Sequence, residues 1–384
     1  MNYTQSMLLM GVMFCMPVIE ACAETVAGVT VTVPDKRDPM KWPFSEKSIW
    51  NTPIGKNAEY VPANLPTDPR GDPWAMMPQV DTDIIVMRPA APLVSITKSS
   101  AAWSGANRCE PDGAEAEVLA QVPIPDDYVV PHSNRNNSAT FLSNDGHTLL
   151  QSQPFTRCRS GSGATALLKF DPVDLYGEGR GGAHGGSRLS AIGGTLRIGE
   201  LRPGGQPPRH VLKVDVDTEL VMRRCSSRSE CYRWPAFSAD SNAARPNGYG
   251  TKASGDNPAA MKMGALLAIP ANIDLTKIGL ETAPAKMLAW TLQNYGAYVV
   301  DSTGGASFAI AVEDGPDGSM RSQFQSDWGF SIEQRVRDNT PWMRDMQRLV
   351  ALLNIVDNNS AANPGGGGTP RQPLAPHIEP PRGD

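Results

Sequence analysis

The stretch Ala139–Gln151, ATFLSNDGHTLLQ, decides the fold class, because it joins two short apolar segments through a tight turn. The turn residues Asn144–Gly146 tolerate the positive φ that short hairpin turns require. We therefore expect an antiparallel hairpin whose strands cover Ala139–Leu142 and His147–Gln151.

Similar strand patterns recur on both sides of this hairpin. The expected strands are Ile84–Met87, Val118–Val122, Thr165–Phe170, Gly194–Leu201, His210–Val216 and Glu219–Met222. Short strands at this spacing, separated by turn residues, are typical of sandwiches and jelly rolls rather than βαβ units. No internal repeat of a propeller or solenoid is visible. The sequence predicts an all-β fold of the β-sandwich or jelly-roll type.

Two peripheral α-helices are expected beside the strands. The first begins at Thr282, tolerates Pro284 in its first turn and ends near Tyr295, where Gly296 suits a left-handed cap. The second begins at Thr340–Pro341, again a capping residue followed by proline. Apolar residues three or four positions apart give each helix one face to bury.

Composition excludes several classes of protein. The chain has 384 residues, with 35 Lys and Arg against 40 Asp and Glu, and 40% of its residues are hydrophobic. This balance is unlike a disordered chain or a membrane bundle, and it lacks the basic excess of a nucleic-acid binder. The 36 glycines and 34 prolines indicate a loop-rich protein.

Residues 1–23 have the pattern of a secretory signal peptide. The apolar run Met7–Ile19 is shorter than the roughly 20 residues that span a bilayer. Ala21–Ala23 supplies the small residues that signal peptidase recognises. No Lys or Arg precedes the run, and acylation of Cys22 is the weaker alternative because Glu20 is bulky and charged. We expect a secreted or periplasmic protein without a membrane span.

Four cysteines follow the signal peptide, and an even number in an exported chain predicts disulfides. Cys225 and Cys231 bracket a short polar loop that suits a local bridge, which leaves Cys109 to pair with Cys158. No cysteine spacing typical of zinc sites is present, so we predict no metal site. Calcium remains an open alternative because it needs only oxygen ligands.

The chain divides into four expected regions. The signal peptide 1–23 is followed by an irregular, proline-rich arm over 24–80 and by the β-sandwich domain with helical insertions over 81–359. The Gly- and Pro-rich tail 360–384 offers little apolar area to bury, so we expect a mobile segment or a thin surface strap. Its removal would then leave the thermal midpoint nearly unchanged.

The densest polar loop is Tyr176–Arg188, in which glycines surround His184. Histidine is the natural acid or base near neutral pH, and Arg188 could hold a carboxylate. The alternative is a surface crossover in which His184 only caps a turn. His210 lies on the apolar face of its strand, where a core histidine and a residue at the mouth of a cleft are both plausible.

Three carboxylates are candidates for acid–base work: Glu200, Asp240 and Asp301. Two carboxylates across a cleft can hydrolyse a glycosidic bond, although each one alone is more often a surface or turn residue. Trp234 and Tyr249 could stack on a sugar or simply pack.

Other known motifs are absent from the sequence. It contains no phosphate-binding loop, nucleophile elbow, HExxH motif, EF-hand or dinucleotide fingerprint, and no cofactor is predicted.

The chain resembles a set of uncharacterised secreted microbial β-sandwich proteins. The segments that carry the resemblance span most of the mature chain: Ser48–Asn51, Gly193–Arg197, Arg209–Lys213, Arg233–Ala236, Met263–Ala265 and Leu292–Asp301. The resemblance implies no reaction, so no catalytic role is transferred from it. The likeness to jelly-roll polysaccharide-active enzymes concerns architecture alone.

Together these features predict an exported enzyme that cleaves a polysaccharide. Both hydrolysis by paired carboxylates and β-elimination by a histidine or tyrosine base remain open. A lyase would act on a uronic acid, whose carboxylate Arg188 or Lys213 could neutralise. The competing class is a non-catalytic glycan-binding or cell-envelope protein.

Overall fold

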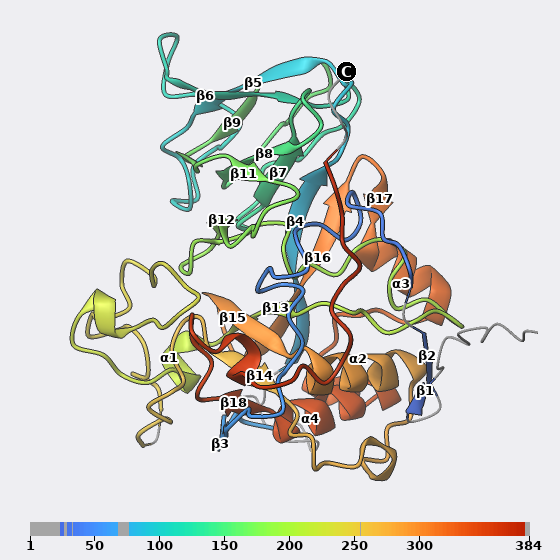
Figure 1. Ribbon diagram of the computed structural model, residues 1–384. Coiled ribbons are helices and arrows are strands. Elements are labelled where there is room, and N and C mark those ends of the chain that lie inside the picture. Colours follow the sequence, from blue (N-terminus) through green and yellow to red (C-terminus); the bar gives the residue numbers. More distant parts are fainter. Residues whose placement is uncertain (1–23, 27–28, 33, 68–76, 254, 381–384) are drawn as a thin grey trace, which may run out of the picture.

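One large mixed sheet runs through the protein (Figure 1). The computed structural model describes residues 24–26, 29–32, 34–67, 77–253 and 255–380, so the predicted signal peptide lies outside the described residues. From one edge to the other, the strands of the sheet are β10 (Leu168–Lys169), β8 (Thr148–Gln153), β7 (Ser138–Leu142), β4 (Met77–Val86), β16 (Ser307–Gly315), β13 (Leu212–Val216), β15 (Ala297–Ser302), β14 (Leu266–Ala268), β18 (Asn354–Val356) and β3 (Tyr60–Pro62). Two further short strands, β11 (Val173–Asp174) and β17 (Gly318–Ser319), pair with β8 and β16.

The centre of this sheet contains parallel pairs. Strand β4 lies parallel to both β7 and β16, and β13 lies parallel to β15, whereas the other pairs of the sheet are antiparallel. Jelly rolls and Greek-key sandwiches are built from antiparallel neighbours. The prediction of a mainly-β fold is confirmed, and the sandwich or jelly-roll type is not.

A second, smaller sheet covers one end of the large one. It contains β6 (Val118–Pro123), β5 (Leu93–Lys98) and β9 (Ala164–Ala166), at the top of Figure 1. Its apolar side chains pack against those of β7 and the end of β4 in a core of their own. In this core the rings of Phe141 and Phe155 meet edge to face, with centroids 5.0 Å apart. Sheet-on-sheet packing is therefore local to this end.

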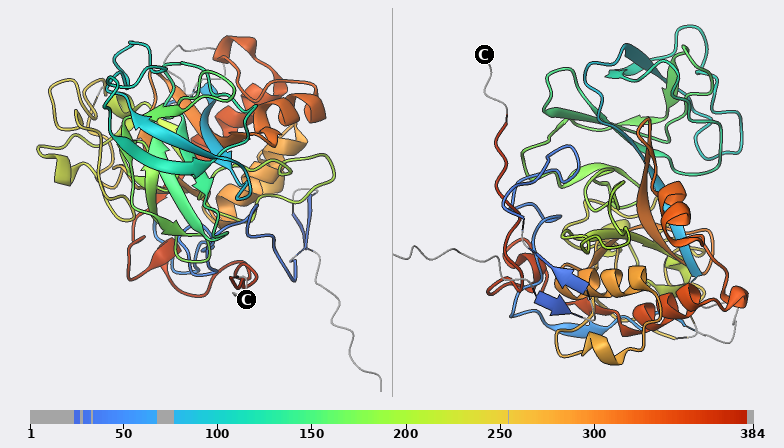
Figure 2. Two further views of the ribbon diagram at one scale, coloured as in Figure 1. Left: turned by 90° about the horizontal axis from the view of Figure 1, so that it is seen from above. Right: turned by 90° about the vertical axis from the view of Figure 1, so that its right-hand side faces the viewer.

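Helices pack on the large sheet at its other end (Figures 1 and 2). Both expected helices are present as α2 (Ala283–Asn294) and α4 (Pro341–Leu352), which pack on one another. The Oγ1 of Thr340 accepts the amide of Met343, as an N-cap should. Two helices were not expected: α3 (Met320–Trp328), which contacts β16, and the single turn α1 (Thr218–Val221).

Two expected strands are wrong. Glu219–Met222 belongs largely to α1, because the carboxylate of Asp217 accepts the amide of Leu220 and starts a helical turn there. The segment 194–201 forms turns, and a Cβ on Gly194 would lie 2.7 Å from the ring of the buried Trp50. This close approach, together with the positive φ of Gly194, replaces a strand by an irregular loop.

The expected hairpin and both expected disulfides are present. Strands β7 and β8 pair antiparallel, with Gly146 at φ 74° in the turn between them. Cys109 is bonded to Cys158, and Cys225 to Cys231. The remaining short strands are β1 (Glu24–Val26), which pairs with β2 (Val29–Val31), and β12 (Gly181–His184).

The described part of the tail is a strap bound to the N-terminal arm. Gly55 donates its amide to the carbonyl of Gly365, and Arg371 donates its own to the carbonyl of Ile54. Arg371 also donates to the carbonyl of Gln293 at the end of α2. Among the described residues, no helix combines the length and the apolar character needed to cross a bilayer.

Candidate functional site

A row of charged side chains lies on one face of the central strands. Asp81 and Asp83 stand on β4, Lys213 and Asp215 on β13, and Asp301 on β15. Within each of β4 and β13 the two residues alternate with apolar or uncharged ones, so they project from the same face of the sheet. Such a set is unusual, because charged side chains are seldom fully buried.

Strand register explains how these groups come together. Asp215 is opposite Asp301 across the parallel β13–β15 pair, and opposite Ala309 across the β13–β16 pair. Ala311, two residues further along β16, is opposite Asp81. Residues opposite one another share a face of the sheet. The small alanines of β16 therefore leave room above the sheet between the charges of β4 and β13.

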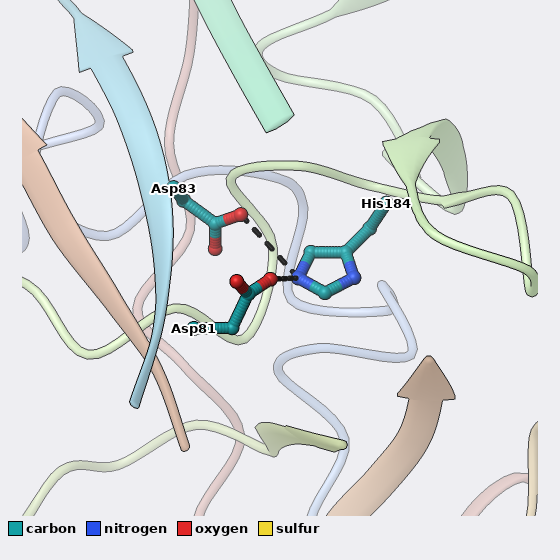
Figure 3. Close-up of side chains that lie close together, drawn as sticks. All are labelled: Asp81, Asp83 and His184. Carbon is teal, nitrogen blue, oxygen red and sulfur yellow. Dashed lines mark ion pairs between the residues drawn. The ribbon is translucent and has the colours of Figure 1, made fainter. Parts of the chain in front are cut away.

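His184 closes over the carboxylates of β4 (Figure 3). Its Nε2 lies 3.4 Å from Oδ2 of Asp81 and 3.4 Å from Oδ1 of Asp83, and the imidazole is fully buried. Neither ring nitrogen makes a hydrogen bond, nor do those two carboxylate oxygens. Burial, and then the positive charge of Lys213, holds the pKa of His184 well below its usual range.

Lys213 contacts the far side of the same cluster. Its ammonium donates to Oδ2 of Asp83 at 2.9 Å and to the carbonyl of Ser190 at 2.7 Å. Thr195 also donates to Oδ2 of Asp83. Lys213 is fully buried, and its ammonium is bound to Asp83 and Ser190. It is therefore not exposed to bind a substrate, contrary to the expectation from the sequence.

The two residues after His184 line a pocket of about 380 Å³. We call it the Asp240–Asp301 pocket, and its lining residues are Trp103, Asn136, Gln153, Leu168, Phe170, Gly185, Gly186, Arg188, Arg228, Asp240, Ser241, Asp301 and Ser302. It thus joins two of the predicted carboxylates and one predicted arginine. A hollow of similar volume beside Cys109–Cys158 has Glu110 as the only carboxylate among its described lining residues.

Gly185 and Gly186 bring the loop against both carboxylates. A Cβ on Gly185 would lie 2.0 Å from Cγ of Asp301, and a Cβ on Gly186 would lie 2.6 Å from Oδ1 of Asp240. The amide of Gly186 donates to Oδ1 of Asp301 at 3.0 Å. Asn136 donates to the other oxygen of Asp301 and accepts the indole N–H of Trp103 at 2.9 Å. Only residues without a side chain at positions 185 and 186 allow the loop to lie this close to Asp301 and Asp240.

The two carboxylates of the pocket differ in environment. Burial, and then the neighbouring Asp240, raises the pKa of Asp301 well above its usual range. Burial also raises the pKa of Asp240, but a hydrogen bond from the hydroxyl of Tyr249 at 2.6 Å and the charge of Arg228 counteract this. Asp301 is thus the better proton donor and Asp240 the better anion.

His210 and Glu200 form a separate pair. The Nε2 of His210 lies 3.1 Å from Oε1 of Glu200, and its Nδ1 lies 3.0 Å from the carbonyl of Val211. Burial lowers the pKa of His210, but Glu200 and the Val211 carbonyl outweigh it, and the net shift is upward. Neither residue is among those that line the Asp240–Asp301 pocket. His210 and Glu200 therefore form a pair apart from His184 and from the carboxylates of the pocket.

Of the other predicted residues, some lie at the Asp240–Asp301 pocket and some do not. Arg188 is exposed at the pocket, and Tyr249 is buried behind Asp240. Trp234 is half-buried against the main core and does not line the pocket.

Sequence reasoning missed Asp81, Asp83 and Asp215. Their signal is the alternation Asp81-Thr82-Asp83 and Lys213-Val214-Asp215, which places charges on one face of an otherwise apolar strand. It was missed on β4 because that strand was expected to begin only at Ile84.

Comparison with known proteins adds no relative: no family model, curated protein or solved structure matches this chain.

Proposed function

We propose that this chain is an exported enzyme that hydrolyses a glycosidic bond of a polysaccharide in the Asp240–Asp301 pocket. The observation that carries the proposal is the presence of two carboxylates with different environments on the wall of one open pocket. Glycoside hydrolysis needs such a pair, one protonated and one ionised.

The roles follow from the environments of the two groups. Asp301, with its raised pKa, would protonate the oxygen of the leaving group. Asp240 would act as the anion, either on water or directly on the sugar carbon, with the hydroxyl of Tyr249 fixing its carboxylate.

The rest of the pocket suits a sugar. Trp103 has 47% of its surface exposed and is held at the pocket by Asn136, so its ring offers an apolar face with polar groups around it. Arg188 and Arg228 add positive charge, which favours a glycan with acidic groups.

Elimination is less well supported than hydrolysis. Burial, and then Asp240, raises the pKa of Tyr249, so this tyrosine is a poor base. His184 is buried beneath the loop and is not among the lining residues of the pocket. A base for β-elimination is therefore absent from the described lining of the pocket, apart from the carboxylates themselves.

The test is a panel of neutral and acidic polysaccharides, assayed for new reducing ends and for the absorbance of unsaturated products. We expect reducing ends without that absorbance, and a fall in turnover of about 10²–10⁴-fold in both Asp240→Asn and Asp301→Asn. The matched control is Asp256→Asn, a carboxylate with 83% of its side chain exposed, which should keep full activity.

Other outcomes discriminate between the alternatives. Unsaturated products would show that the protein is a polysaccharide lyase and not a hydrolase. Binding of a glycan without any cleavage would favour the non-catalytic glycan-binding protein. Cleavage that survives both substitutions would place the catalytic groups elsewhere.

A further inference from the structure

The residues Asp81, Asp83 and His184 form a cluster distinct from the paired carboxylates of the pocket. One ligand atom from each of the three lies within 4.8 Å of the others. All three come from rigid positions, two on β4 and one at the end of β12 (Figure 3). The cluster is used by no step of the proposed hydrolysis.

The cluster contains unpartnered polar atoms in a buried place. The imidazole of His184 is fully buried and its Nε2 points between the two carboxylates, yet it makes no hydrogen bond. Oδ2 of Asp81 and Oδ1 of Asp83 are also buried and without hydrogen bonds. A buried polar atom without a partner destabilises the folded protein, because it has given up its hydrogen bonds to water. An ion that contacts all three atoms would satisfy them together.

The charges on this face of the sheet also favour a bound cation. Five buried or nearly buried carboxylates lie on it: Asp81, Asp83, Asp215, Asp301 and Glu313, of which Glu313 is paired with Arg197. Lys213 is the one buried cation on the strands that carry them, within the described residues. Buried charges need compensation, by protonation or by a cation. A divalent cation at the cluster would supply two positive charges beside Asp81 and Asp83.

The spacing of the atoms admits a metal ion, and the ligand types select its kind. Ligand atoms held about 2.1 Å from a tetrahedral ion are about 3.4 Å apart. Both distances from Nε2 of His184 to the carboxylate oxygens are 3.4 Å. An imidazole together with carboxylates suits zinc and similar transition metals, whereas calcium and magnesium prefer oxygen ligands alone.

We infer that Asp81, Asp83 and His184 bind one divalent transition-metal ion, with zinc as the best fit. The inference stands on this geometry and does not depend on the proposed hydrolysis. The side chain of Asp81 is 12% exposed, so it marks the side from which an ion could enter. Binding at His184 would also fix the adjoining Gly185 and Gly186 against Asp301 and Asp240.

The alternative for the same atoms is a histidine ion pair. A protonated His184 could share its hydrogen between the two carboxylates without any metal. Burial disfavours a positive charge on the ring, whereas the two carboxylates favour it. The experiment below separates the two accounts.

The test begins with the full chain treated with a chelator and titrated with Zn²⁺, Mn²⁺ or Ca²⁺ in separate calorimetric experiments. We expect one Zn²⁺ per chain, weaker binding of Mn²⁺, and no binding of Ca²⁺ at the same concentrations. Zinc should also raise the thermal midpoint by several degrees, because it binds the folded state alone. Failure of zinc to bind the wild-type chain or to shift its midpoint would overturn the inference.

Variants locate the site. Asp81→Asn and His184→Gln should each weaken zinc binding by about 100-fold or more, since each removes one of three ligands. Asp215→Asn is the matched control, a buried carboxylate on the same sheet face outside the cluster, and it should keep the wild-type affinity. An equal loss of zinc affinity in Asp215→Asn would show that the overall negative charge of the sheet face binds the ion. It would contradict a site formed by Asp81, Asp83 and His184.

A spectroscopic measurement keeps the test independent of the folding of the variants. Co²⁺ added to the chelated wild-type chain should give the visible absorption of a tetrahedral site, saturating at one ion per chain, and Zn²⁺ should abolish it. Weak absorption typical of six-coordinate Co²⁺ would contradict a three-residue zinc-type site.

Discussion

The amide of Gly186 donates to the carboxylate of Asp301 across 3.0 Å, which ties the loop after His184 to the end of β15. The contact requires a residue without a side chain, because a Cβ on Gly186 would lie 2.6 Å from Oδ1 of Asp240. One short loop thus sets the positions of both carboxylates in the pocket, although they lie far apart in the sequence.

Gly186→Ala should therefore impair activity more than stability. The added methyl group displaces Asp240, and a misplacement of about 1 Å at a catalytic group can cost roughly 10²-fold in rate. We expect kcat/KM on the glycan identified in the panel to fall by about that factor, measured by reducing-end release.

Gly305→Ala is the control, since a Cβ there would meet nothing within 4 Å. It should retain wild-type activity. Full activity in Gly186→Ala would show that the loop does not position the carboxylates.

Local signals in the sequence predicted local structure well. Thr282 and Pro284 mark the beginning of α2, and Gly296, at φ 77°, follows its end. The same holds for the turn between β7 and β8. These features depend on the conformational preferences of a few neighbouring residues, which one sequence displays.

Features that depend on distant contacts were harder to predict. The alternation of side chains on β4 and β16 is the same for parallel and antiparallel pairing, so the parallel pairs were not visible. Helix α3 was missed because most of it is polar, with Met320 and Phe324 as its buried residues. The cluster of Asp81, Asp83 and His184 joins residues about 100 positions apart, which no local spacing could indicate.

The two disulfides should differ in their contribution to stability. Cys109 and Cys158 are 49 residues apart, and Cys225 and Cys231 are 6 apart. In the chain-entropy model the longer loop gives about 4 kcal/mol and the shorter one about 2 kcal/mol. Denaturant unfolding of Cys109→Ser/Cys158→Ser should thus show the larger loss.

Thiol titration provides the control for this comparison. A chain that begins at Glu24, denatured without reductant, should contain no free thiol, and each double variant should also contain none. Two free thiols in the unaltered chain would contradict the pairing, and a larger loss for the Cys225/Cys231 pair would contradict the entropic account.

Removal of the tail should destabilise the protein, contrary to the expectation from its composition. A chain ending at Ser360 loses the backbone hydrogen bonds to Gly55 and Ile54, and those to Lys56 and Asn57. At about 0.5–1.5 kcal/mol net for each bond, the loss is about 2 kcal/mol or more. The thermal midpoint should fall by roughly 3 °C or more, measured by calorimetry.

A shorter truncation, ending at Pro380, keeps all these contacts and should leave the midpoint unchanged. If the chain ending at Ser360 has the same thermal midpoint as the full-length protein, the strap contributes nothing to stability and the expectation from composition is correct.

The pair of His210 and Glu200 should make stability depend on pH. The pKa of His210 is raised in the folded protein, so folding favours the protonated ring, whose unfolded pKa is about 6.5. This stabilisation is fully present below pH ~6.5 and is lost as the pH rises through the folded pKa. We expect the free energy of unfolding, measured with denaturant, to decrease between pH 6 and pH 9.

His210→Gln tests the source of that decrease, because glutamine can still donate to Glu200 but does not titrate. The variant should be less stable than the wild-type chain at pH 6, because it lacks the positive charge of the ring beside Glu200, and the difference should be much smaller at pH 9. The control is His147→Gln. The ring of His147 is about half exposed beside Asp145, so this substitution should leave the pH profile of stability unchanged. A decrease of the same size in His210→Gln and the wild-type chain would show that other groups cause it, and the pair would then be structural at every pH.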